Sequence, residues 1–225
     1  MILPQTLPDL DAVEDGSAAE ARPVDADAAA ARTRADYGRV SRWALGLLGT
    51  AGAVAGILPL GFAVDVVATG HDPLGDGVFA VIVVGLAAIL LVPSIRLLVA
   101  LHRSGRRLAR AAGFWAGLPY RQGRRAPTRG DWFAARFAGF SADLLLRLIT
   151  SAFAALAAIF AASMVYYGAV VQPSAATVAI AVASTALFAA VCIGQFGGVQ
   201  RIQRGYTARD PRTFARRGSG DGTPG

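Results

Sequence analysis

The chain has 225 residues, of which 54% are hydrophobic and only 16% are charged. In a soluble domain of this size about a quarter of all residues are charged, so the composition excludes an ordinary soluble protein. All 22 basic residues are arginines, and the formal net charge is +7. These arginines flank apolar runs, which is typical of a membrane protein and not of a nucleic-acid-binding face. The arginine and alanine bias indicates GC-rich coding and favours a bacterial source.

The N-terminal segment, residues 1–36, is acidic. Residues 1–31 contain seven acidic residues and one arginine, and alanine and proline make up much of the rest. A segment with so little apolar surface is predicted to form a disordered cytoplasmic tail. The first residues lack the basic start and the long apolar stretch of a signal peptide, so none is expected.

Four uncharged apolar runs follow the acidic segment. They cover residues 43–64, 78–95, 148–171 and 175–199. A helix of about 20 such residues crosses the hydrocarbon core of a bilayer, and none of the runs has the polar stripe of a soluble bundle helix. We therefore predict an all-α integral membrane protein with four transmembrane helices, arranged as two hairpins over residues 37–101 and 143–199.

The arginines predict the orientation of these helices. The connections 70–77 and 172–174 contain no arginine, whereas the linker 102–142 and the tail 200–225 are rich in it. Positively charged loops stay on the cytoplasmic side of a membrane. Both termini are therefore expected in the cytoplasm, and the protein is expected to be a multi-pass protein of the inner (plasma) membrane.

The linker between the hairpins has a helical pattern. Its apolar residues recur at helical spacing while arginines occupy the other faces: Leu101, Leu108, Ala112, Trp115 and Leu118. A basic amphipathic helix of this kind is suited to lie among anionic headgroups. A second short helix is expected from Asp131 onward. The linker could serve in lipid sensing or partner docking, or only in interfacial anchoring.

Charged residues near the four runs are candidate functional residues, because charge is costly in a bilayer. Asp65 is expected at the outer interface and Arg96 at the inner one, so these two side chains are not expected to pair. Arg136, Asp143 and Arg147 precede the third run. Asp143 and Arg147 stand four residues apart with the acid first, which favours a helical ion pair. The alternative is a site for a transported ion or a partner.

Small residues repeat at intervals of four in the apolar runs. Gly194 and Gly198 continue an alanine series in the fourth run, and Gly52 and Gly56 form a GxxxG pattern in the first. Such spacing lets helix backbones approach closely. The stripes are expected to pack within the bundle or against a second copy or partner.

Signatures of chemistry are few. The chain has one cysteine, Cys192, and two histidines, and it lacks the metalloprotease, nucleophile-elbow and Walker motifs. We therefore expect no catalytic residue, no cofactor and no metal, and an enzyme is the least favoured class.

One short resemblance to a known family is present. The stretch from Phe133 to Asp143 resembles the Arg-x2-small-x3-Asp opening of RDD-family membrane proteins, and residues 194–198 are similar to that family's Gly-x-Thr-x-Gly segment. The resemblance covers only residues 133–198. It departs from the family pattern by lacking the Thr, the following basic residue, the third helix and the later Asp, so we do not assign the chain to this family.

These observations lead to two main hypotheses on function. The first is a non-enzymatic membrane component, an accessory or partner-binding, sensor-like subunit whose arginine-rich inner side binds anionic headgroups and possible protein partners or a second copy of the chain. The second is a small oligomeric transporter or pore subunit. No interaction with nucleic acid is expected.

Overall fold

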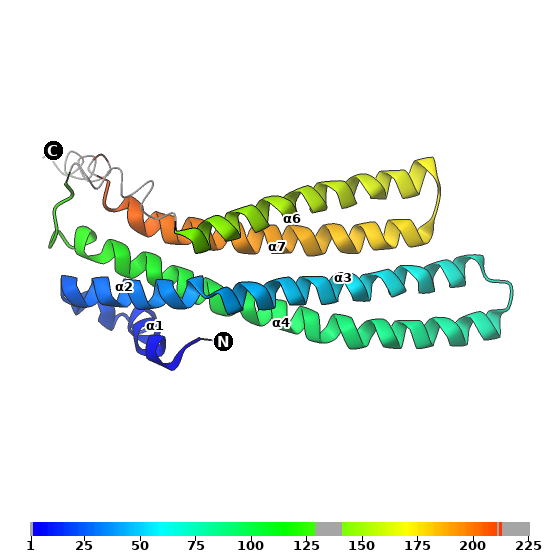
Figure 1. The fold of residues 1–225 in the computed structure, drawn as a ribbon, viewed down its shortest axis with the longest axis horizontal. Helices are drawn as coiled ribbons and strands as arrows, with labels where there is room; N and C mark the ends of the chain where they lie inside the picture. Colours follow the sequence, from blue (N-terminus) through cyan, green and yellow to red (C-terminus); the bar gives the residue numbers. More distant parts are fainter. Residues whose placement is uncertain (1, 129–140, 211, 213–225) are drawn as a thin grey trace, which may run out of the picture. The chain divides into compact units, whose positions relative to one another are not determined.

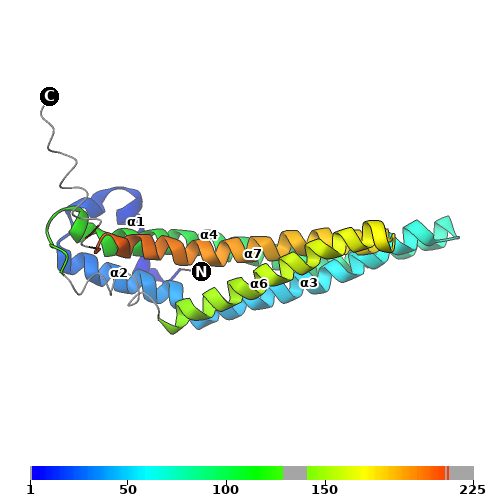
Figure 2. The ribbon, with the colours of Figure 1, turned by 90° about the horizontal axis from the view of Figure 1, so that it is seen from above.

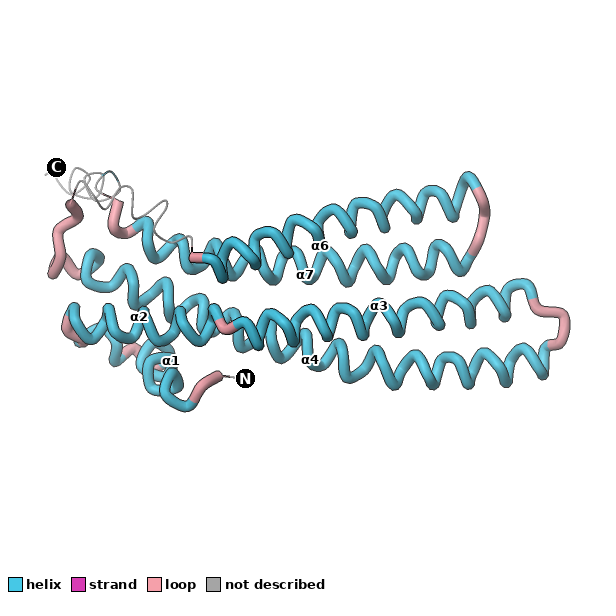
Figure 3. The backbone as a smooth tube through the Cα atoms, viewed as in Figure 1, coloured by secondary structure: helices cyan, strands magenta, loops and turns pink. Residues whose placement is uncertain are grey.

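The computed structural model describes residues 2–128, 141–210 and 212 of the chain. The described residues form helices joined by short loops, with no strand among them (Figure 3). Arg136 and the short helix expected from Asp131 lie outside the described residues. Four of the helices are long and apolar enough to cross a membrane, as the sequence predicts.

The four long helices are α3 (Val40–Thr69), α4 (Pro73–Arg121), α6 (Ala142–Tyr166) and α7 (Ala175–Thr207) (Figure 1). A π-helical segment, η4 (Tyr167–Val171), extends α6. Polar side chains mark the starts of two of these helices. The Ser174 hydroxyl accepts a hydrogen bond from the backbone N–H of Thr177, and an Asp72 carboxylate oxygen accepts one from the N–H of Leu74. Such caps satisfy N–H groups that have no partner inside the helix.

The described chain divides into two compact units. Unit 1 comprises Met1–Arg42, His102–Leu148 and Phe196–Gly225, and unit 2 comprises Trp43–Leu101 and Ile149–Gln195. Each unit is therefore built from segments that are far apart in the sequence.

Unit 2 exposes large apolar side chains. Ile89, Phe153 and Phe160 are each more than 65% exposed, and most other exposed large apolar residues also lie in unit 2. Monomeric soluble proteins rarely expose continuous apolar surface on this scale. Hydrocarbon is the medium in which such a surface is stable, which agrees with the prediction of membrane-spanning helices.

Within unit 2, α3 and α4 meet along small residues. A Cβ atom added at Gly49 would lie 3.1 Å from Leu98, and one added at Gly56 would lie 2.6 Å from Leu91. Ser94 packs against Gly52 in the same row. At the start of α3, the indole N–H of Trp43 donates a 3.0 Å hydrogen bond to the Thr150 hydroxyl of α6. The GxxxG pattern of the first run therefore serves packing within the chain.

The N-terminal segment differs from the prediction. Residues 4–38 form η1 (Pro4–Thr6), α1 (Leu7–Glu14), η2 (Ser17–Glu20) and α2 (Pro23–Gly38) instead of a disordered tail. In both views α1 and α2 lie beside the last turns of α4 (Figures 1 and 2). Alanine is the best helix former, and the alanines of α2 align on one buried face, with Ala26 and Ala29 at most 2% exposed. The prediction counted large apolar residues and overlooked this face.

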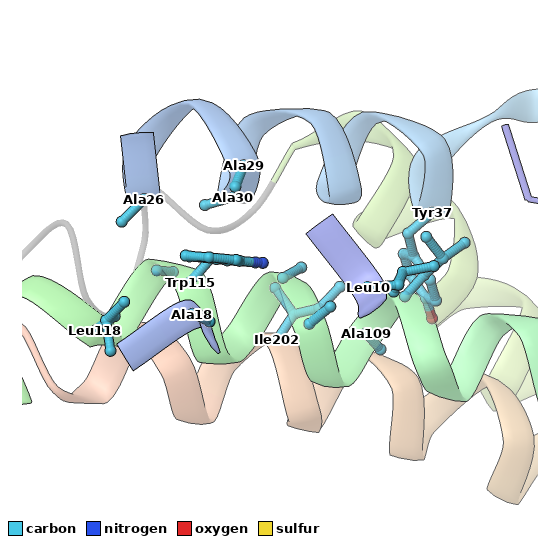
Figure 4. Close-up of a cluster of buried hydrophobic side chains, with 14 of the residues drawn as sticks. Leu10, Ala18, Ala26, Ala29, Ala30, Tyr37, Ala109, Trp115, Leu118 and Ile202 are labelled. Carbon is cyan, nitrogen blue, oxygen red and sulfur yellow. The ribbon is translucent and has the colours of Figure 1, made fainter. Parts of the chain in front are cut away.

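The core of unit 1 lies between the N-terminal segment and α4. Leu10 and Ala18 pack with Leu108 and Trp115 of α4 and with Ile202 of α7, all 4% exposed or less (Figure 4). The indole N–H of Trp115 donates a 3.0 Å hydrogen bond to the backbone oxygen of Asp9. The apolar face of the linker helix was expected among lipid headgroups. It is instead buried in this core, because the N-terminal helices supply a protein surface that covers it.

A buried carboxylate anchors the start of the chain in unit 1. One oxygen of Asp36 accepts 2.8 Å hydrogen bonds from the backbone N–H of Leu3 and from the Thr6 hydroxyl. Thr6 and Asp36 are almost fully buried. Removing one partner of such a network leaves a buried polar group unsatisfied, which costs about 1–3 kcal/mol. The network joins η1 to the end of α2.

Candidate functional site

Several arginines of unit 1 are bonded to the N-terminal segment. Arg107 forms a two-pronged ion pair with Glu14, with N–O distances of 2.7 and 2.8 Å. Arg125 pairs with Asp27 at 2.7 Å. These carboxylates neutralise part of the arginine-rich linker, Arg107 on α4 and Arg125 in the loop after it. The acidic segment and the arginine-rich linker are thus partners within one unit.

Four other arginines lie on α4 and α7, and we call them the α4–α7 arginine cluster: Arg106, Arg110, Arg201 and Arg204. No carboxylate of the described residues pairs with any of them. Three of the four side chains are exposed, and that of Arg201 is half-buried. An exposed group of like charges is a ready binding surface for an anion.

Close helix packing brings the cluster together. A Cβ atom at Gly113 of α4 would lie 2.5 Å from the backbone oxygen of Arg201, and one at Gly205 of α7 would overlap the backbone of Gly113. Gly117, one turn later on α4, approaches Gly205 and Ala208, which lie later on α7 than Arg201, so the two helices run parallel here. The Arg201 side chain reaches back along α7 toward Gly197, with Nη1 3.2 Å from the position of a Cβ atom there. Arg110 and Arg201 stand about one turn before this contact, Arg106 stands two turns before it, and Arg204 is next to it on α7.

The electrostatics of the cluster agree with this geometry. Burial lowers the pKa of the Arg201 guanidinium, and repulsion from Arg106, Arg110 and Arg204 lowers it further. Burial also lowers the pKa of nearby His102, with added repulsion from Arg106 and Arg201. The cluster is a region of uncompensated positive potential that an anion would relieve.

A second set of charged residues surrounds Tyr37, at the end of α2. The guanidinium of Arg147 lies 4.4 Å from the centre of the Tyr37 ring, and its Nη2 donates a 2.7 Å hydrogen bond to the Tyr37 backbone oxygen. Arg42 donates a 2.8 Å hydrogen bond to the Ser104 hydroxyl of α4. Both arginines are only 7% exposed. The first contact joins α6 to α2 and the second joins the start of α3 to α4, which is a structural role in unit 1.

The predicted candidate residues have different surroundings. Arg147 is part of the group around Tyr37, and Asp143 accepts a hydrogen bond from the Ser141 hydroxyl and packs against Gly38. The ion pair between Asp143 and Arg147 stays a prediction. A methyl group at Gly198 would overlap the Tyr37 hydroxyl, so this glycine serves packing inside unit 1.

Three other predicted residues lie in unit 2. Asp65 is exposed near the end of α3, and Arg96 is exposed on α4. Gly194 is half-buried in α7 and is the next-to-last residue of unit 2 in that helix.

The sequence did not single out Tyr37, Arg42 or the α4–α7 arginine cluster as a site. The four arginines of the cluster stand in two separate segments, the linker and the tail, and nothing in the order of the chain joins these segments. One signal was present, since Gly113 and Gly205 stand among arginines on α4 and α7. Glycines within helices allow close approach of two backbones.

Unit 2 contains an apolar cavity of about 570 Å³. Residues of α3, α4 and α7 line it, among them Ile57, Val64, Val84 and Ile180. The side chains that line it are aliphatic and offer no oxygen or nitrogen atom to bind an ion or a polar solute. The cavity therefore gives no support to a polar transport path along its walls.

No group of three or more His, Cys, Asp or Glu side chains that could hold a metal occurs among the described residues. The chain matches no protein-family model, and no curated protein sequence and no solved structure is significantly similar to it. The resemblance of residues 133–198 to the RDD family thus gains no support from a family match.

Proposed function

We propose that the protein is a non-enzymatic component of a bacterial inner membrane that acts as an accessory or partner-binding, sensor-like subunit. In this proposal α3 with α4 and α6 with α7 form two transmembrane hairpins, and both termini lie in the cytoplasm. The arginine-rich inner side binds anionic headgroups and a protein partner. The positive-inside rule supports the orientation, because the arginines of the chain are absent from both predicted outer connections.

The observation that carries this proposal is the α4–α7 arginine cluster. The N-terminal segment neutralises Arg107 and Arg125, yet it leaves the cluster without a carboxylate partner among the described residues. Uncompensated charge on a surface steers and binds molecules of opposite charge. A membrane component that recruits an acidic partner requires such a surface.

Affinity purification in mild detergent tests the proposal. A protein that co-purifies in stoichiometric amount should be retained by the wild type and lost from Arg110→Gln/Arg204→Gln. The control is Arg107→Gln/Arg124→Gln, which removes the same charge from arginines that bond to the N-terminal segment. Absence of any stoichiometric partner, or equal retention by both double variants, would overturn the partner-binding role.

The alternative proposal is a small oligomeric transporter or pore subunit. Reconstituted protein that moves an ion or solute across liposomes, and loses this activity in Asp65→Asn, would establish the alternative. On the component proposal, wild-type liposomes show the same leakage as empty ones.

A further inference from the structure

The α4–α7 arginine cluster is larger than one monovalent anion requires. It holds four guanidinium groups, two on each helix, and Arg106 and Arg110 are separated by one helical turn, about 6 Å along the axis. A guanidinium binds phosphate through paired N–H groups, so two arginines suffice for one phosphate group. The charge and the length of the cluster together match two phosphate groups.

The position of the cluster along the chain indicates the source of these phosphates. Arg201 and Arg204 follow the fourth apolar run, which ends at residue 199, by two and five residues. At a rise of 1.5 Å per residue, they lie about 3 and 8 Å past the apolar run. Arg106 and Arg110 stand five and nine residues after Leu101, where the first hairpin ends, which is about 8 and 14 Å along α4. The headgroup layer on each side of a bilayer is about 5–8 Å thick, so Arg106, Arg201 and Arg204 coincide with the depth of lipid phosphates, and Arg110 stands one turn further along α4.

We propose that the α4–α7 arginine cluster binds the headgroup of an anionic phospholipid that carries two phosphate groups. The parallel contact at Gly113 and Gly205 holds the two pairs of arginines in place before the lipid binds. Basic pockets between transmembrane helices on the cytoplasmic side are known to bind such headgroups. This inference rests on the proposed function, because both place the cluster on the inner side of the membrane.

Native mass spectrometry of the purified protein, without any partner, tests the inference. The detergent-solubilised chain is titrated with diphosphatidylglycerol, with phosphatidylglycerol at twice the concentration to equalise charge, and with phosphatidylcholine. We expect the wild type to retain the two-phosphate lipid at least tenfold more tightly than either of the others. Inorganic pyrophosphate serves as a soluble competitor without acyl chains.

Two double variants locate the site. Arg106→Gln/Arg201→Gln should weaken retention of the two-phosphate lipid about tenfold or more. Arg107→Gln/Arg124→Gln removes the same net charge outside the cluster and should change retention by less than twofold. Thermal stability of each variant in detergent, measured in parallel, excludes loss of binding by unfolding.

The inference is overturned if charge-matched phosphatidylglycerol binds equally well, or if both double variants lose lipid equally. Complete displacement of the lipid by equimolar pyrophosphate would also overturn it, because the site would then bind a free anion and not a lipid. This assay contains no protein partner. Failure here, with co-purification of a partner intact, therefore refutes the lipid site alone, whereas the reverse result refutes the partner-binding role alone.

Discussion

At the scale of single residues, the arginines of this chain differ by what surrounds them. Arg147 is buried over the Tyr37 ring, Arg107 is neutralised by Glu14, and Arg106 has no carboxylate partner among the described residues. Chemically identical side chains thus have three roles: some pack in the core, some hold the N-terminal segment, and some leave an exposed positive charge. Burial and the nearest carboxylate decide between them.

The ion pair between Glu14 and Arg107 should make the docking of α1 depend on pH. The hydrogen bond from Arg107 lowers the pKa of Glu14 below its ordinary value. The pair therefore stabilises the folded state above the ordinary pKa of about 4.3, and this stabilisation is lost as the pH falls through the lowered value. Both side chains are about half exposed, so the effect is below about 1 kcal/mol.

We expect Glu14→Gln to lower the midpoint of thermal unfolding in detergent by less than about 4 °C at pH 7. At about pH 2, well below the ordinary carboxyl range, the variant and the wild type should unfold at the same temperature. Glu20→Gln is the control, because Glu20 forms no ion pair with a described residue. A difference between Glu14→Gln and the wild type that persists at low pH would contradict the assignment.

At the scale of elements, α4 combines two environments in one helix. Its residues up to Leu101 belong to unit 2, and those from His102 onward belong to unit 1. In the second part, Leu108 and Trp115 are buried against the N-terminal segment. An amphipathic helix needs an apolar partner on one face, and here the chain supplies that partner itself.

Leu108→Ala should release the N-terminal segment. Leu108 is fully buried, and a Leu→Ala change at such a site costs about 2–5 kcal/mol. We expect faster cleavage by trypsin after Arg32 of α2, whose side chain pairs with Asp9 of α1 in the docked segment. Leu145→Ala is the matched control, because Leu145 is 50% exposed in the part of α6 that belongs to unit 1. Equal cleavage of both variants would contradict docking through this core.

At the scale of the whole molecule, the helices of unit 2 require hydrocarbon around them. Their exposed apolar side chains would associate in water. The connection between α3 and α4 carries aspartates and no arginine, whereas the segment after α4 carries several arginines. This asymmetry underlies the proposed orientation.

Single cysteines test that orientation in a Cys192→Ala background. A membrane-impermeant maleimide applied to intact cells or right-side-out vesicles should label Gly75→Cys and leave Gly123→Cys unlabelled until the membrane is opened. Both glycines are exposed in loops or at a helix start, so labelling reports the compartment and not burial. Labelling of both positions from the same side would refute the two-hairpin topology.

The sequence by itself determined the four long apolar helices, because about 20 consecutive residues without charge have one stable solvent, hydrocarbon. Its small-residue pattern at Gly52 and Gly56 also predicted a close helix contact, which α3 makes with α4. Local composition is sufficient for such features, since they depend on residues that are neighbours in the chain.

Only the tertiary structure decided what the polar segments do. Leu10 and Asp9 both contact Trp115, which is more than 100 residues away in the sequence. No local pattern predicts contacts over such a separation. The sequence therefore predicts a disordered acidic segment and a linker helix at the membrane surface. Likewise, the backbone contact of Gly113 with Gly205 joined arginines of the linker and the tail into one cluster. Burial and charge pairing between distant segments are properties of the folded chain, because each segment provides the surface that the other lacks.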